Sequence, residues 1–187
     1  MPKFITATFF VLFSVGAFAQ VGRKAEEVCY NPNLVKDTSK KSIKSTAFAL
    51  FNKDSITINY HSPGVRKRII WGGLVPLNEV WVTGAHDATT IKFDFPVRVG
   101  GKTIPAGKYA FFTIPGKTEW TLIINRQWQQ HLATEYEQQE DIVRVKVKPR
   151  KNAHTERLQY FVKNAGANKG SIAVAWDKLL VELPISL

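Results

Sequence analysis

The chain has 187 residues, with 26 basic and 15 acidic side chains and one cysteine. A chain of this length is about one domain and buries a core large enough to fold without disulfides. The lone Cys29 excludes a disulfide-stapled scaffold. The net charge of +11 favours anionic partners. We expect acidic glycans, lipid head groups or an acidic protein, and no nucleic acid.

The N-terminal residues 1–19 have the organisation of a signal peptide. Lys3 provides a basic start, an apolar run covers residues 4–13, and Ala17-Phe18-Ala19 is a small-x-small cleavage site. The run is shorter than the roughly 18 to 20 apolar residues of a spanning helix. The sequence therefore predicts export to the periplasm or beyond, with no transmembrane segment after cleavage.

Residues 20–42 are polar and lack apolar periodicity, which predicts a flexible lead-in before one domain over 43–187. Short runs rich in β-branched and aromatic residues follow, separated by Gly, Pro and Asn turns. They cover 47–51, 56–60, 79–83, 89–95, 97–99, 108–114, 120–125, 142–148, 157–162, 171–176 and 179–183. This pattern predicts an all-β fold, a single jelly-roll-like β-sandwich with at most one short helix.

The one candidate helix lies within residues 126–139, because Trp128, Leu132 and Tyr136 recur at four-residue spacing. The run that follows alternates valines with basic residues, so one face packs and the other is positively charged. We predict a possible anion-binding stripe here; the alternative is an edge strand protected by charge against aggregation. The stripe comprises Arg144, Lys146, Lys148, Arg150 and Lys151.

The candidate chemistry centres on the histidines and one aspartate. The chain has four histidines, His61, His86, His131 and His154, but none has metal-ligand spacing, so we predict no metal and no cofactor. His86 with Asp87 and nearby threonines supplies the residue types of a hydrolase, although no strained elbow surrounds a serine. Catalytic residues are not identifiable, and paired carboxylates and phosphate loops are missing.

The chain also has five tryptophans, which could form a sugar-stacking platform. Trp120 begins an alternating run and Trp176 ends one, so both are predicted to pack between sheets. Trp71 and Trp128 lie in irregular segments and are the candidates for exposure.

Many short motifs in order resemble the DUF2911 family of secreted bacterial proteins, which is common in Bacteroidetes. They are Arg68-Ile69-Ile70-Trp71-Gly72, Leu74-Val75-Pro76, Val80-Trp81, Thr83-Gly84-Ala85, Ala88-Thr89-Thr90, Pro105-Ala106-Gly107-Lys108-Tyr109, Phe112-Thr113-Ile114-Pro115-Gly116-Lys117 and Glu119-Trp120. The family is of unknown function, so the resemblance implies an exported bacterial domain and no activity. Where members typically have arginine, asparagine and glutamate, this chain has Val82, His86 and Asp87, so a shared reaction is not implied.

The leading hypothesis is a non-enzymatic exported module that binds an anionic or carbohydrate partner at the cell envelope. Its candidate ligand-binding residues are Arg68, Trp71, His86, Asp87 and Trp128. One alternative is an envelope hydrolase or metal-dependent enzyme that uses the loop of His86 and Asp87. A third is a structural or assembly component of the envelope. The oligomeric state is left open.

Overall fold

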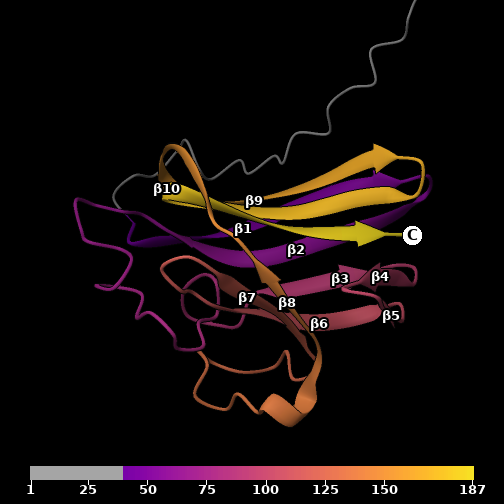
Figure 1. Ribbon diagram of the computed structural model, residues 1–187, viewed down its shortest axis with the longest axis horizontal. Helices are drawn as coiled ribbons and strands as arrows, with labels where there is room; N and C mark the ends of the chain where they lie inside the picture. The colour runs from indigo at the N-terminus through magenta and orange to yellow at the C-terminus, as the bar shows by residue number, and fades with distance from the viewer. Residues whose placement is uncertain (1–39) are drawn as a thin grey trace, which may run out of the picture.

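The computed structural model describes residues 40–187, which form two antiparallel sheets that pack face to face (Figure 1). The first sheet has the order β1 (Ser42–Phe51), β2 (Asp54–Pro63), β3 (Thr90–Phe93), β6 (Gly107–Ile114), β7 (Trp120–Asn125) and β8 (Asp141–Val147). The second has the order β5 (Lys102–Ile104), β4 (Val97–Val99), β10 (Lys169–Ser186) and β9 (Arg150–Gly166). The predicted all-β sandwich is confirmed. The predicted leader 1–19, most of the lead-in 20–42 and Cys29 lie outside the described residues.

The hairpin of β1 and β2 shows how the sequence builds the first sheet. Residues that alternate along β1 are buried, among them Ala47 and Phe51, while Lys44 and Thr46 between them are exposed. Phe51 pairs with Asp54 across the turn. Because side chains alternate between the two faces of a strand, one set covers the core, and the other, which includes Phe48 and Leu50, forms the outer face of the sheet.

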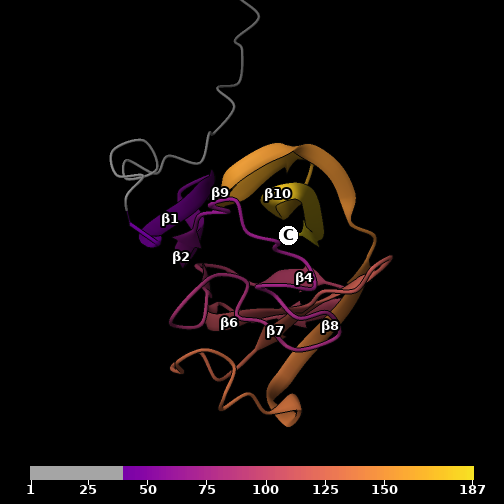
Figure 2. The ribbon, with the colours of Figure 1, turned by 90° about the vertical axis from the view of Figure 1, so that its left-hand side faces the viewer.

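The last two strands form most of the second sheet. β9 arcs over from the end of β8, so it carries the chain from one sheet to the other (Figure 2). β10 reverses direction near Asp177, which has φ 51. The N–H of Leu187 donates to the Asn168 carbonyl at 3.0 Å, which closes the two halves against each other. The predicted runs 171–176 and 179–183 are these two halves.

Four tryptophans meet between the sheets. Trp71, Trp81, Trp120 and Trp176 lie with ring centroids 4.8 to 6.5 Å apart, and most pairs are edge-to-face. Trp120 and Trp176 are buried, as predicted. Trp71 is half-buried in this cluster. Since Trp71 and Trp81 belong to the long connection between β2 and β3, the cluster packs that connection against the sandwich.

Two predicted elements differ in the structure. In place of a helix within 126–139, the described chain has an irregular segment that ends in the 3-10 turn η1 (Gln138–Glu140). Leu132 has φ 54, which an α-helix does not allow. Trp128 and Tyr136 instead pack on a second small core that contains Phe112, so their spacing reflects packing of a loop.

The predicted strand 79–83 is reduced to a single bridge. Trp81 and Thr113 exchange backbone hydrogen bonds of 2.8 and 2.9 Å. The pairing does not continue because Thr83 has φ 52, which turns the chain away. Within residues 40–187, no helix has the length and apolar character needed to cross a membrane.

Candidate functional site

A groove of about 760 Å³ lies on the outer face of the six-stranded sheet. Strand pairing forms its floor, because Lys44 lies opposite His61 and Thr46 lies opposite Asn59. The next two strands extend this floor with Thr90 of β3 and Lys108 of β6. The walls come from Asp87 and Ala88 on one side and from Trp128, Gln129, Gln130 and His131 on the other.

The loop that carries His86 and Asp87 is fixed by Gly84. A Cβ on Gly84 would lie 3.1 Å from the His61 carbonyl oxygen and 2.9 Å from Thr89 Oγ1. Only glycine allows the loop to pack this closely on β2. The glycine of the Thr83-Gly84-Ala85 motif therefore places the loop directly beside His61.

A buried network holds the start of the same loop. Thr83 Oγ1 donates to Thr113 Oγ1 at 2.9 Å, and the Tyr160 hydroxyl donates to the Thr83 carbonyl at 2.8 Å. Burial raises the pKa of the Tyr160 phenol well above its usual value, so the hydroxyl keeps its proton. This network ties the loop to both sheets, since Thr113 lies on β6 and Tyr160 on β9.

Two histidines meet at the end of the groove. The rings of His61 and His86 lie 5.1 Å apart, edge to face. His86 Nε2 also lies 2.8 Å from Ser42 Oγ. Burial lowers the pKa of His61, and the charges of His86 and Lys44 lower it further, while Asp87 opposes them. His61 is therefore held toward its neutral form.

The third histidine contacts Asp87 across the mouth of the groove. Asp87 and His131 pair in an isolated antiparallel bridge, and Leu132 N donates to the His86 carbonyl at 2.7 Å. His131 Nδ1 lies 3.3 Å from Asp87 Oδ1, with both side chains exposed. Three histidines and one carboxylate thus gather here. Even so, within the described part of the chain no three His, Cys, Asp or Glu side chains are arranged to hold a metal ion.

Trp128 positions a cation. Lys108 Nζ lies 3.7 Å from the centroid of the Trp128 ring, a cation–π contact. The ring is half-buried against the second core. Since Lys108 covers one of its faces, Trp128 holds the ammonium group over the groove and does not offer that face for stacking.

Amide side chains in the groove are oriented by neighbours. Thr46 Oγ1 donates to Asn59 Oδ1 at 2.8 Å, which leaves the Asn59 amide N–H groups for another partner. Gln130 Nε2 donates to the Gln127 carbonyl at 2.7 Å. The buried Gln130 Oε1 accepts no hydrogen bond from any described residue.

The other predicted ligand-binding residues lie outside this groove. Arg68 is in the loop of residues 64–75, where its guanidinium donates to the Gly64 and Val65 carbonyls at 2.6 and 3.2 Å. Trp71 belongs to the tryptophan cluster. The structure therefore brings Asp87 and Trp128 to one groove with His86 at its end, and separates them from Arg68 and Trp71.

The predicted basic stripe is largely neutralised by acidic partners. Arg144 pairs with Asp141 at 2.7 Å and Lys146 with Glu119 at 2.9 Å. Arg150 pairs with Glu182. Lys148 and Lys151 form no ion pair within residues 40–187. Surface pairs of this kind reduce the local positive field, so the stripe is a weaker anion site than its composition indicates.

Sequence reasoning missed the floor of the groove. Exposed positions on strands, such as those of Lys44, Thr46, Asn59 and Lys108, are by themselves a weak signal of a site. Their convergence depends on the pairing of β1 with β2 and of β3 with both β2 and β6. The sequence does not specify that pairing.

The fold and the groove define a small β-sandwich domain with a polar, cation-rich site on one sheet face. A family model described as "Protein of unknown function (DUF2911)" matches residues 42–185, from the start of β1 almost to the end of β10, and the chain belongs to this family. Neither a curated protein nor a solved structure matches the chain. Function therefore has to be argued from the groove.

Proposed function

We propose that the groove binds an anionic carbohydrate, a sugar that carries a carboxylate or phosphate group. The observation that carries this proposal is the convergence of Lys44, His61, Lys108 and His131 from four separate chain segments. Asp87 is the one carboxylate that lines the groove with them. Two lysine cations against one carboxylate favour a negatively charged ligand, and the rings of His61 and His131 add hydrogen-bonding groups.

The remaining lining groups suit a polyhydroxylated ligand. Thr46, Thr90 and Gln129 offer hydroxyl and amide groups, the Asn59 amide donates, and Asp87 accepts. A volume near 760 Å³ lies within the range of about 300 to 1,000 Å³ for small-molecule sites. The predicted leader supports a further part of the proposal, that the protein meets this ligand at the cell envelope.

Isothermal titration calorimetry with a uronic acid oligosaccharide, a sugar phosphate and a neutral oligosaccharide tests the proposal. Lys108→Gln should weaken binding of the charged sugars about tenfold or more, because a charge-assisted hydrogen bond is lost. Lys163→Gln, on β9 of the other sheet, is the matched control and should leave affinity unchanged. Equal binding of the neutral sugar, or an unaffected Lys108→Gln variant, would contradict the proposal.

A second candidate is acid–base catalysis on the same ligand, favoured by the 3.3 Å contact of His131 with Asp87. The predicted pairing of His86 with Asp87 is not formed, since Asp87 contacts His131 and His86 contacts Ser42. A base oriented by a carboxylate would here be His131. Release of new reducing ends from a bound oligosaccharide, abolished by His131→Gln but not by His154→Gln, would support catalysis. His154 is a suitable control because it also contacts carboxylates at 3.3 Å.

A further inference from the structure

The loop of residues 64–75 is a compact, well-braced projection. The N–H groups of Gly72 and Leu74 donate to the carbonyls of Val75 and Ile69 at 2.9 and 3.0 Å. A Cβ on Gly73 would lie 2.5 Å from the Ile69 carbonyl oxygen, so the turn is closed tightly. Its inner side chains, Ile70 and Val75, are each 2% exposed and belong to the main core. Such a loop holds its outer side chains in fixed positions.

Those outer side chains are apolar. Ile69 is 78% exposed and Leu74 is 45% exposed. The hydrogen bond between Leu74 N and the Ile69 carbonyl joins the two residues across the turn. Ile69 is the most exposed large apolar side chain of the described residues. An apolar pair at the tip of a rigid loop is typical of a surface that meets a partner.

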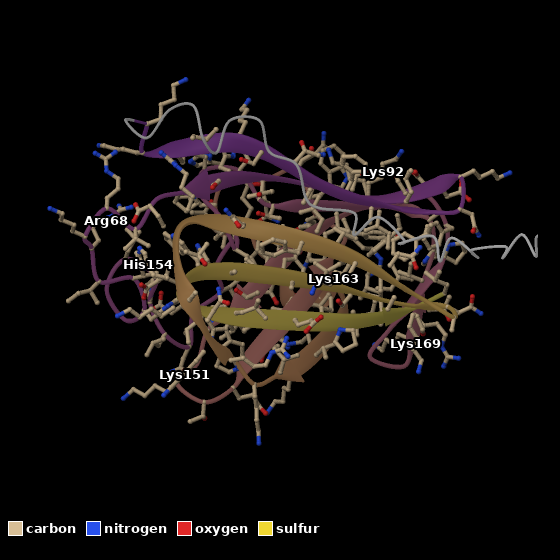
Figure 3. All side chains as sticks on the ribbon, turned by 90° about the horizontal axis from the view of Figure 1, so that it is seen from above. Arg68, Lys92, Lys151, His154, Lys163 and Lys169 are labelled. Carbon is tan, nitrogen blue, oxygen red and sulfur yellow. The ribbon has the colours of Figure 1, made fainter. Side chains whose placement is uncertain are left out.

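Cations precede this tip. Arg66, Lys67 and Arg68 are exposed, and the Arg68 guanidinium donates to neutral backbone carbonyls, so its charge is not cancelled. Arg68, Lys151 and His154 project from the same end of the sandwich (Figure 3). Glu156 lies at the base of the loop, where it accepts from the Arg66 N–H, and both Glu156 and Asp177 contact His154 at 3.3 Å. The positive charge at this end therefore comes from the arginines and lysines. Basic side chains therefore outnumber acidic ones around the apolar tip.

We propose that this loop docks on an anionic lipid surface, with Ile69 and Leu74 inserted among the acyl chains and the cations placed at the head groups. Apolar insertion with flanking basic residues is how monotopic segments bind bilayers. A protein partner fits less well, because a stable interface buries about 800 Å² on each side and two side chains on a convex tip supply much less. This proposal is independent of the sugar-binding groove.

Sedimentation of the full chain with vesicles tests the proposal, using phosphatidylglycerol mixed equally with phosphatidylcholine, and phosphatidylcholine alone. Ile69→Ser with Leu74→Ser should weaken partitioning to the anionic vesicles about tenfold or more. Phe48→Ser with Leu50→Ser is the matched control, since these side chains are 45% and 46% exposed on β1. Both double variants change exposed positions, so thermal unfolding should confirm that each remains folded.

The charge contribution has its own pair of variants. Lys67→Gln should weaken binding to the anionic vesicles about fivefold, and added salt should remove the difference. Lys169→Gln, at the opposite end of the sandwich, should have no effect (Figure 3). Equal losses in both apolar double variants, or none in either, would overturn the proposal. So would a dimer in solution that dissociates on Ile69→Ser with Leu74→Ser, since a second copy of the chain would then cover the tip.

Discussion

Replacement of Gly84 by alanine should lower the free energy of unfolding, and the contacts around this glycine indicate by how much. The added Cβ would lie 2.9 Å from Thr89 Oγ1 and 3.1 Å from the His61 carbonyl oxygen. The His61 carbonyl belongs to β2, so it moves only if the sheet moves. Thr89 can rotate, but rotation breaks its 3.2 Å hydrogen bond to the Thr83 carbonyl. Overpacking costs about 1 to 3 kcal/mol and the lost hydrogen bond about 1 kcal/mol, so we expect about 2 to 4 kcal/mol.

Urea denaturation of Gly84→Ala, followed by tryptophan fluorescence, measures this loss. Gly101→Ala is the control: Gly101 has a positive φ of 82, so alanine there is strained, but an added Cβ has no described atom within 4 Å. That variant should lose only about 1 kcal/mol, from backbone strain. Adding Thr89→Ala to Gly84→Ala should cost little more, because it removes the closest contact. If Gly84→Ala is as stable as Gly101→Ala, the close packing of the loop on β2 is refuted.

Three further predictions concern titration and the groove. Burial raises the pKa of Tyr160, so its stabilising contribution should be lost as pH rises above its usual value of 10.0; Tyr160→Phe should flatten this alkaline decline in melting temperature. The Lys92 hydrogen bond lowers the pKa of Asp94 to about 2, so stability should fall as pH drops from 3.8 toward 2, and less so in Asp94→Asn. His86→Asn should leave folding intact, since asparagine tolerates the observed φ of 61, while the pKa of His61, followed by NMR, should rise.

The sequence predicts strands well where alternation is strong. The run 120–125 coincides with β7, and the predicted runs 47–51 and 56–60 lie within β1 and β2. β5 was missed because Lys102 and Thr103 are polar and exposed, whereas β4, of the same length, has two buried valines. The helix within 126–139 was predicted wrongly because packing of Trp128 and Tyr136 on a neighbouring surface reproduces a helical spacing by coincidence.

The site could be predicted only in part, for a physical reason. Asp87 and His86 were recognised from their residue types, since a turn that carries ionisable groups is visible in a sequence. Lys44 and Lys108 were not, because an exposed lysine on a strand is ordinary until the sheet order places two such strands along one groove. Residue chemistry is local, whereas a groove depends on pairing between distant segments, such as β2 with β3.

The connection between β2 and β3 carries two kinds of residue, those that pack on the sandwich and those that are exposed at the groove. Trp71, Trp81 and Gly84 have structural roles: the two tryptophans belong to the tryptophan cluster, and Gly84 packs on β2. His86 and Asp87 are exposed at the groove. Substitutions of the three packed residues should therefore lower the free energy of unfolding. Substitutions of His86 and Asp87 should instead change the charge of the groove and hence its affinity for the proposed anionic ligand.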